Sequence, residues 1–398
     1  MIMTDNNENK VLNVPHLRFP KFSGEWEICK VSELLDFYST NSLSWEQLEY
    51  GEKAMMNLHY GLIHVGLPTM VDLRRDKLPN VKEGNMPKNF ELCKEGDVAF
   101  ADASEDTNEV AKVIELFNLD NKDIVCGLHT IHGRDNKNKT IVGFKGYAFS
   151  SSAFHNQIRR IAQGTKIYSI STKNFSECYV GIPSKAEQTK IATLLRLIDE
   201  RIATQNKIIE DLKKLKSAIS HILFSSKGAI HLSEIANVVM GQSPSSNAYN
   251  DQGLGMPLVQ GNLDISNGKT TPRLYTAEFN QTTEKGNIIL TVRAPVGEVA
   301  KATQKVCLGR GVCAIIPHEE NMSDFIYQYL TFYKFMWRRY EQGSTFTSIN
   351  GSDVRNIFCP KVRNVSILTL LDIKINIEER VVKQYQSQKQ YMLYQMFI

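Results

Sequence analysis

Residues 182–202 read IPSKAEQTKIATLLRLIDERI, and this stretch predicts the start of a long helix. Ser184 and Glu187 form an S-x-x-E capping box directly after a proline, which is a signature of a helix N-terminus. From Ile191 onward apolar residues recur at steps of four and three, without a Gly or Pro for more than thirty residues. We therefore expect one helix over 185–224, ~60 Å long at ~1.5 Å per residue.

The apolar positions of this helix form a heptad seam, which needs a partner. Its ten positions are Ile191, Leu195, Ile198, Ile202, Gln205, Ile209, Leu212, Lys216, Ile219 and Leu223, and Leu194, Ile208, Leu215 and Ile222 widen it. The C-terminal tail has similar spacing at Leu368, Leu371, Ile375, Val382, Tyr385, Met392 and Met396, interrupted by Glu378 and Lys389. We expect the tail to be a helix that packs antiparallel on 185–224. The alternative is a core helix of an ordinary globular domain.

An internal repeat is the second pattern. Residues 159–171 read RRIAQGTKIYSIS and residues 338–350 read RRYEQGSTFTSIN, with six of the thirteen positions identical. Three more pairs keep the same order: KVSELLDF (30–37) with HLSEIANV (231–238), EGDVAF (95–100) with KGNIIL (285–290), and EVAK (109–112) with EVAK (298–301). Self-similarity in a conserved order indicates duplication. We predict two β-rich units of short strands and loops, with short helices at 30–38, 231–239 and 323–340.

Composition and missing motifs exclude several classes of protein. The 398 residues carry a net charge of +4 and seven cysteines without a CxxC pair, which favours a reduced, cytoplasmic setting over a disulfide framework. No apolar run reaches the ~18–20 residues that cross a bilayer. Nucleotide-binding loops and the Asn/Asp-Pro-Pro-aromatic tetrapeptide of amino-methylating DNA enzymes are also missing from the sequence. We therefore expect no catalytic residues and no cofactor. Three acidic-x-Lys triplets, as in metal nucleases, are expected by chance in a chain this charged.

The segment CGLHTIH (126–132) places Cys126, His129 and His132 three residues apart, which raises the question of a zinc site. In one strand, side chains alternate between faces, so His129 would point away from the other two residues. No second Cys or His cluster in the sequence supplies the missing ligands. We therefore interpret the segment as a structural strand and predict no metal site.

The two Arg-Arg stretches are the candidate DNA contacts. Guanidinium, amide and hydroxyl groups beside a glycine can reach phosphate oxygens. The candidates are Arg159, Arg160, Gln163, Thr165 and Lys166 in the first stretch, and Arg338, Arg339, Gln342, Ser344 and Thr345 in the second. The alternative is a helix C-terminus, with basic residues in its last turn followed by a glycine.

A further candidate lies in a loop that differs between the two units. Residues 290–301 contain Arg293, whose guanidinium can pair with a guanine edge. The matching loop at 100–112 offers Asp102, Glu105, Asp106 and Asn108 instead. For each loop, the alternative is a turn without DNA contact.

The segments VPHLRFPKFSGEWEICKVSELL (14–35) and QGTKIYSISTKNFSECYVGIPSKAEQTKIATLLRLIDERI (163–202) resemble specificity subunits of type I restriction–modification systems. The resemblance implies an α/β (α+β) fold, with two tandem α/β target recognition domains separated by two long antiparallel coiled-coil-like helices and a pseudo-two-fold internal repeat. It implies recognition domains at 1–182 and 227–359 and helical spacers at 183–226 and 360–398. The second spacer departs from the pattern, because CPKVRNVSILTLLDIKINIEERV (359–381) lacks the Glu-Gln and Lys-Ile-Ala elements. This departure predicts an altered helix register or a weaker contact with a partner subunit.

The resemblance also implies a function. Such a subunit reads a bipartite site in double-stranded DNA, one half per recognition domain, and performs no catalysis. Its expected partners are methyltransferase (modification) subunits, two per chain, and restriction/translocase subunits. Two other classes stay open on the residues alone: a single-chain DNA methyltransferase or nuclease with unrecognised motifs, and a helical interaction scaffold that reads no sequence.

Overall fold

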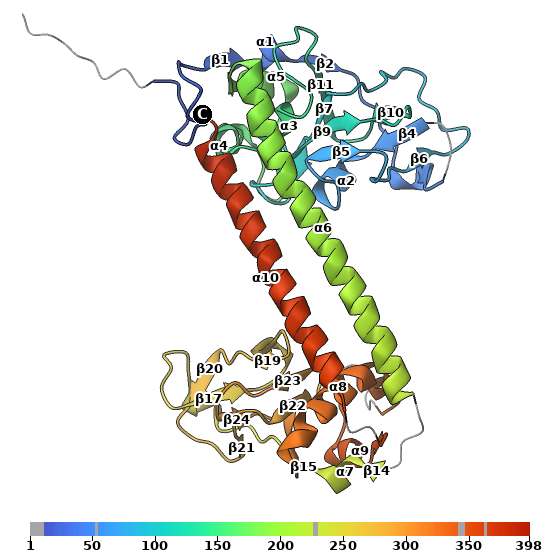
Figure 1. Cartoon of the computed structure of the whole chain (residues 1–398), viewed down its shortest axis with the longest axis vertical. Coiled ribbons are helices and arrows are strands. Elements are labelled where there is room, and N and C mark those ends of the chain that lie inside the picture. The colour runs from blue at the N-terminus through green and yellow to red at the C-terminus, as the bar shows by residue number, and fades with distance from the viewer. Residues whose placement is uncertain (1–11, 52–54, 226–229, 341–346, 362–363) are drawn as a thin grey trace, which may run out of the picture. The chain divides into compact units, whose positions relative to one another are not determined.

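The computed structural model describes residues 12–51, 55–225, 230–340, 347–361 and 364–398, and the fold is mixed α/β. The chain divides into two compact units, each built from two larger β-sheets, from at least one small two-stranded ladder and from parts of two long helices (Figure 1). Unit 1 comprises Met1–Gln205 with Val381–Ile398, and unit 2 comprises Asn206–Arg380. Among the described residues, no helix is long and apolar enough to span a membrane.

Unit 1 contains a five-stranded sheet in the order β2-β11-β7-β9-β5. Its strands are β2 (Asp36–Tyr38), β5 (Met70–Asp72), β7 (Val98–Ala101), β9 (Val113–Asn118) and β11 (Thr130–Arg134). A second sheet has the order β10-β4-β6-β3, from β3 (Leu48–Glu49), β4 (Met55–Leu58), β6 (Asn80–Val81) and β10 (Asp123–Cys126). Two small ladders pair β1 (Glu27–Lys30) with β13 (Tyr179–Ile182), and β8 (Ala103–Ser104) with β12 (Tyr168–Ser169). Its short helices are α1 (Val31–Leu34), η1 (Trp45–Gln47), α2 (Tyr60–His64), α3 (Lys145–Phe149), α4 (Ser152–Ile161) and α5 (Thr172–Ser176).

Unit 2 contains a six-stranded sheet in the order β15-β25-β22-β23-β19-β18 and a five-stranded sheet in the order β16-β20-β17-β24-β21. The first comprises β15 (Ala236–Met240), β18 (Ile265–Ser266), β19 (Lys269–Thr270), β22 (Ile288–Thr291), β23 (Val299–Lys301) and β25 (Val312–Pro317). The second comprises β16 (Tyr249–Asn250), β17 (Met256–Val259), β20 (Leu274–Thr276), β21 (Thr282–Thr283) and β24 (Val306–Leu308). Strand β14 (Ile230–His231) pairs with β26 (Phe358–Cys359). Its short helices are α7 (Leu232–Ile235), η2 (Ser246–Ala248), η3 (Asn262–Asp264), η4 (Glu320–Met322), α8 (Ser323–Tyr333), η5 (Lys334–Arg339) and α9 (Gly351–Arg355).

The predicted duplication is confirmed by the strand order of both sheets. The order β2-β11-β7-β9 in unit 1 repeats as β15-β25-β22-β23 in unit 2, with antiparallel pairing throughout. The order β10-β4-β6-β3 repeats as β24-β17-β20-β16, and the pair β10·β4 is parallel, as is β24·β17. The units therefore share one framework whose positions can be compared strand by strand.

The long helices α6 (Lys185–Phe224) and α10 (Ser366–Gln395) confirm the two predicted helices. In unit 1, Leu195 of α6 and Leu393 of α10 belong to the same buried cluster. In unit 2, Lys213 pairs with Glu379 at 2.7 Å and Lys216 with Asp372 at 2.6 Å. Residue numbers increase along α6 from Lys213 to Lys216 while those of their partners on α10 decrease, so the two helices run antiparallel there. Buried apolar side chains thus stabilise the packing of the two helices, and the ion pairs fix the register of one helix against the other.

The Glu-Gln pair at the start of α6 attaches this helix to the β-rich part of unit 1. Arg18 binds the buried Glu187 carboxylate through Nε and Nη2, at 2.7 and 2.8 Å. Gln188 donates to the carbonyl oxygens of Lys139 and Pro183 and accepts from the amide of Ile141. The start of the helix α10 has no such Glu-Gln pair.

In unit 2, the start of α10 is held differently. Val365 and Leu368 are buried in the apolar core of the unit. Asn364 Oδ1 accepts hydrogen bonds from the amide and the hydroxyl of Ser366. Thr369 Oγ1 also donates to Asp324 Oδ2 at 3.2 Å, and Gln328 Nε2 donates to Asp372 Oδ2 at 2.7 Å. The second copy, which lacks the Glu-Gln element, therefore attaches its helix through other polar contacts and a buried apolar start.

Three predicted short helices differ from the structure. The segments predicted at 30–38 and 231–239 form only α1 and α7, because the next residues enter β2 and β15. The backbone of β2 pairs with β11, and that of β15 with β25, so the ladder takes the residues that a longer helix would use. The segment predicted at 323–340 is α8 followed by the 3₁₀-helix η5.

Candidate nucleic-acid interface

The first Arg-Arg stretch ends a helix and continues into an exposed loop. Arg159 and Arg160 lie in the last turn of α4, as the helix C-terminus alternative required, and both are exposed. The loop residues Gln163, Thr165 and Lys166 are also exposed. Gly164 has φ +136°, and a Cβ there would lie 1.9 Å from the carbonyl oxygen of Ile167, so only glycine fits this turn.

This loop lies beside the acidic loop 100–112, which corresponds in the internal repeat to the loop that carries Arg293. The ladder β8·β12 joins Ser104 to Tyr168, and the amide of Ile170 donates to the carbonyl oxygen of Asp102 at 2.9 Å. Arg159 Nη1 donates to Asn108 Oδ1 at 3.0 Å. The fold therefore brings the basic stretch and the acidic loop of unit 1 together on one edge.

Unit 2 makes the same arrangement. Arg293 forms a β-bridge with Ser348, and the amide of Ala294 donates to the carbonyl oxygen of Thr347 at 3.0 Å. Arg338 and Arg339 are exposed in the last turn of η5. The remaining candidates of this stretch, Gln342, Ser344 and Thr345, lie outside the described residues.

Three arginines line an open hollow of about 710 Å³ in unit 2, together with Gln260 and Asn262. Arg273 is held by the Asp264 carboxylate at 3.0 Å. Arg293 and Arg310 are exposed, and neither side chain has a hydrogen-bond or ion-pair partner among the described residues. Two guanidinium groups are thus free for an acceptor-rich ligand such as phosphate or a guanine edge.

Arg310 was missed by the sequence reasoning. It lies in a Gly-Arg-Gly turn between β24 and β25. A Cβ at Gly311 would lie 2.1 Å from the carbonyl oxygen of Gln260, and a Cβ at Gly309 would lie 2.9 Å from the Gln260 side chain. The glycines let this turn pack on the strand end while Arg310 stays exposed. Gly-Arg-Gly was the available signal, but only the strand order shows that it lies next to Arg293.

The equivalent strand ends of unit 1 carry different chemistry. The turn after β10 carries His129, whose Nδ1 lies 3.1 Å from Asp102 Oδ1 at the end of β7. Its ring lies 5.2 Å from Tyr60, which stacks on His59 at the end of β4. Trp45, half exposed, covers His59 with ring centroids 4.5 Å apart. Unit 1 therefore presents aromatic and imidazole groups where unit 2 presents guanidinium groups.

His59 is held neutral in this cluster. Burial lowers the pKa of His59, and the nearby His129 lowers this pKa further. Its Nδ1 accepts a hydrogen bond from the amide of Gly61 at 3.1 Å, which fixes the ring at the N-terminus of α2. The neutral His59 ring therefore lies against Trp45 in a fixed orientation.

The CGLHTIH segment is two strands rather than the single strand predicted. Cys126 ends β10, His129 lies in the turn with φ +54°, and His132 lies in β11. The premise of one alternating strand was therefore wrong, although Cys126 and His132 do converge. Cys93 joins them, since its amide donates to the carbonyl oxygen of Ile124 at 2.9 Å. The potential ligand atoms of Cys93, Cys126 and His132 all lie within 4.8 Å of one another.

Comparison with known proteins shows which family this chain resembles. The profile of the family described as "Type I restriction modification DNA specificity domain" matches residues 76–214 and 228–384, once in each half of the chain. A Methanocaldococcus jannaschii protein, described as a candidate MjaX specificity subunit of a type I restriction enzyme, is 30% identical over 260 residues. That alignment covers 60% of this chain and 61% of the relative, so the chain spans less than two thirds of it.

Two solved structures show a similar fold. One is a type I restriction–modification S subunit from M. genitalium, with a TM-score of 0.61, 20% identity, and coverage of 97% of this chain and 99% of that one. The other comes from a study of complex assembly and conformational transition of the type I restriction–modification system. It has a TM-score of 0.59, 20% identity, and coverage of 92% and 96%. At this identity the likeness establishes the fold alone.

Proposed function

Because the chain belongs to the family of type I restriction modification DNA specificity domains, we propose that it selects the DNA sequence on which a type I restriction–modification complex acts. Residues 1–182 and 227–359 each read one half of a bipartite site in double-stranded DNA. The segments 183–226 and 360–398 carry these two recognition domains.

One observation carries this proposal: the two units repeat one strand framework but differ in side chains at the same strand ends. After β22 and β24, unit 2 has Arg293 and Arg310, which suit acceptor-rich guanine edges. After β7 and β10, unit 1 has Asp102 and His129. Two readers of different half-sites need a common support and different base contacts, and a shared framework with different side chains at its strand ends supports this proposal.

The Arg-Arg stretches supply the contacts that do not depend on sequence. Arg160, Arg338 and Arg339 are exposed, and their side chains form no hydrogen bond or ion pair among the described residues. In each unit, the backbone that follows the arginine pair lies beside the candidate reading loop. Phosphate contacts from this position fix the register in which the reading side chains meet the bases.

The partners are two methyltransferase subunits and restriction/translocase subunits, which supply all catalysis in the cytoplasm. The support for docking is an exposed apolar stripe on α6 in unit 2. Ile208, Leu215 and Ile222 are spaced by seven residues and are 39%, 49% and 79% exposed. A solvent-exposed stripe at heptad spacing is suited to a helix of another subunit.

The test is methylation sequencing of DNA from cells that express the chain with its methyltransferase subunit. The expected motif consists of two short specified sequences separated by a fixed number of unspecified base pairs. Cells with the methyltransferase alone are the control and should lack this motif. A continuous motif, or methylation by this chain without the other subunit, would exclude the proposal and favour a single-chain methyltransferase.

A further inference from the structure

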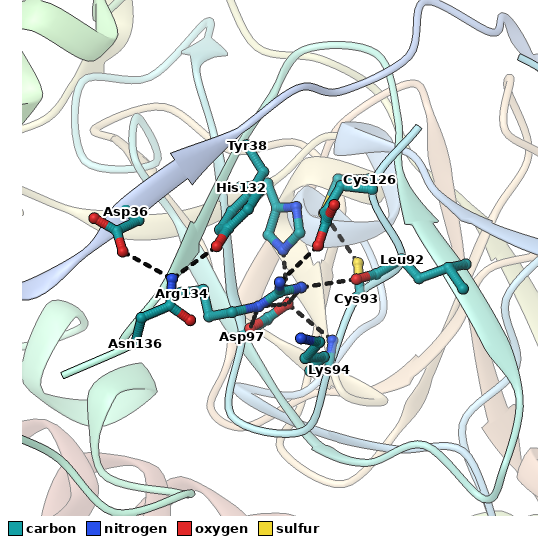
Figure 2. A network of polar contacts seen from close by, with 11 residues as sticks. Asp36, Tyr38, Leu92, Cys93, Lys94, Asp97, Cys126, His132, Arg134 and Asn136 are labelled. Carbon is teal, nitrogen blue, oxygen red and sulfur yellow. Dashed lines mark hydrogen bonds and ion pairs between the residues drawn. The ribbon is translucent and has the colours of Figure 1, made fainter. Parts of the chain in front are cut away.

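The described residues contain a buried cluster of metal-ligand side chains in unit 1 that DNA reading does not use (Figure 2). Cys93, Cys126 and His132 come from three separate segments of the chain. Their thiol sulfurs and a ring nitrogen lie within 4.8 Å of one another, and all three residues are buried. The sulfurs of Cys93 and Cys126 are 3.5 Å apart, and both cysteines are free. Two thiolates bound to tetrahedral zinc at ~2.3 Å would stand about 3.8 Å apart, so this spacing suits zinc.

The histidine supplies an independent observation. His132 Nε2 lies 2.8 Å from Asp97 Oδ2. A carboxylate only accepts hydrogen bonds, so Nε2 carries a proton, and in the neutral imidazole Nδ1 is then the nitrogen with the free lone pair. His132 Nδ1 is buried without a partner among the described residues, which is uncommon for a buried polar atom. A metal ion bound at Nδ1 would satisfy it.

The surroundings of Asp97 match the usual support of a metal-bound histidine. Arg134 holds the Asp97 carboxylate through Nε at 2.9 Å and Nη2 at 2.8 Å. The amide of Lys94 also donates to Asp97 at 2.8 Å. A carboxylate behind the histidine fixes the ring and its tautomer and makes the free nitrogen a better ligand. Figure 2 shows this chain of contacts from Arg134 through Asp97 to His132.

The framework does not require these residues. In unit 2, Leu308 ends β24 as Cys126 ends β10, and Ala314 faces Ile289 as His132 faces Ala99. Leu308, Ala314 and Ile289 form part of an apolar cluster. An aliphatic core therefore satisfies the same fold, and the Cys and His side chains of unit 1 need another explanation.

We propose that Cys93, Cys126 and His132 bind one zinc ion through two thiolates and the Nδ1 imidazole nitrogen, with a solvent molecule as the fourth ligand. Thiolate and imidazole together are the donor set that zinc prefers in proteins. The ion joins the segment before β7 to β10 and β11 and fixes both ends of the turn that carries His129. Binding releases the two thiol protons to solvent, and no oxidant or reductant is involved.

The test uses the full-length chain, reduced and stripped of metal with a chelator. Titration with Co²⁺ should give one equivalent of binding and a thiolate-to-cobalt charge-transfer band, and Zn²⁺ should displace the cobalt. In chelator competition, Cys126→Ser and His132→Gln should each weaken zinc binding by more than tenfold. Asp97→Asn, which acts through His132, should weaken it roughly 10–100-fold. Cys178→Ser, buried in the same unit outside the cluster, should bind zinc like the parent.

The parent spectrum decides the question even where a ligand variant fails to fold. A reduced parent chain that gives no thiolate-to-cobalt band would overturn the proposal. So would zinc affinity that is unchanged in folded Cys126→Ser and His132→Gln. A Cys93–Cys126 disulfide in the isolated chain, together with no metal binding after reduction, would overturn it in favour of a redox pair.

Discussion

Lys389 Nζ on α10 lies 2.7 Å from Asp199 Oδ1 on α6, and the two side chains are only 17% and 18% exposed. The hydroxyl of Tyr147 donates to the other oxygen of Asp199 at 2.8 Å, and Lys389 also lies over the Tyr147 ring. Lys389 interrupted the heptad seam in the sequence. In unit 1 the interruption is an ion pair that fixes the helix register against the core.

Breaking this pair should cost more than breaking a surface pair. Asp199→Ala removes the partner of a partly buried lysine, so we expect destabilisation of ~1–3 kcal/mol in urea unfolding. A double-mutant cycle with Lys389→Ala should give a coupling of roughly 1 kcal/mol. Lys214→Ala, which breaks an exposed pair with Glu210, is the control and should change stability by under about 0.5 kcal/mol. A coupling near zero would show that the pair does not set the register.

The seam of α6 gives a second prediction from two adjacent residues. Ile209 is 8% exposed and Ile208 is 39% exposed. Ile209→Asp buries a carboxylate in the seam of unit 2 and should destabilise the chain by several kcal/mol. Ile208→Asp, one residue away on the open face, should change the free energy of unfolding of the isolated chain far less. Equal melting curves for the two variants would mean that the seam contributes no stability.

The Arg-Arg stretches predict a change in the salt dependence of DNA binding. Arg159→Ala with Arg160→Ala, and Arg338→Ala with Arg339→Ala, should weaken binding to all sequences alike. Each lost phosphate contact should reduce the slope of log K against log salt by ~0.9. Lys207→Ala with Lys214→Ala on the exposed face of α6 removes the same charge and should leave the slope unchanged. If both arginine double variants keep the parent slope, these arginines serve only the fold.

Arg310 and Arg293 should contribute to discrimination between DNA sequences rather than to the overall affinity for DNA. Arg310→Ala should relax discrimination at one base pair by ~1–3 kcal/mol, read as methylation rates on a library of sites that differ by one pair. Only the half-site read by unit 2 should be affected. His129→Ala in unit 1 is the matched control and should change only the other half-site. A uniform loss of affinity in Arg310→Ala would assign this arginine to phosphate.

Patterns that repeat at fixed spacing were predictable from sequence. The heptads predicted both long helices, because apolar residues that recur every 3.5 residues lie on one face of a helix that packs against another helix. The similar stretches EGDVAF (95–100) and KGNIIL (285–290) indicated the duplication, and they lead into the buried central strands β7 and β22. The family resemblance drawn from residues 14–35 and 163–202 is confirmed by the family match in both halves of the chain.

Features that depend on distant partners were not predictable. Asp36–Tyr38 extends because β11, almost a hundred residues later, pairs with it, and nothing local to this segment signals that pairing. Cys93 lies 33 residues before Cys126, so no motif spacing joins it to the cluster. Arg310 and Arg293 line the same hollow because β22 and β24 both end there. Local sequence patterns therefore specify helices and strands. The candidate DNA-contact site forms only when the sheets bring the ends of strands that are distant in sequence together.

The exchange of one recognition domain tests the central claim most directly. The ladder of β14 with β26 places Ile230 opposite Cys359, so the segment 230–359 begins and ends at one place within unit 2 and can be replaced together with this ladder. We would replace it with the equivalent segment of another specificity subunit and sequence the methylated DNA. The account predicts that one half of the methylated motif changes, while the other half and the spacer length stay the same. A chimera that alters both half-sites, or that keeps the parent motif, would contradict independent reading by the two units.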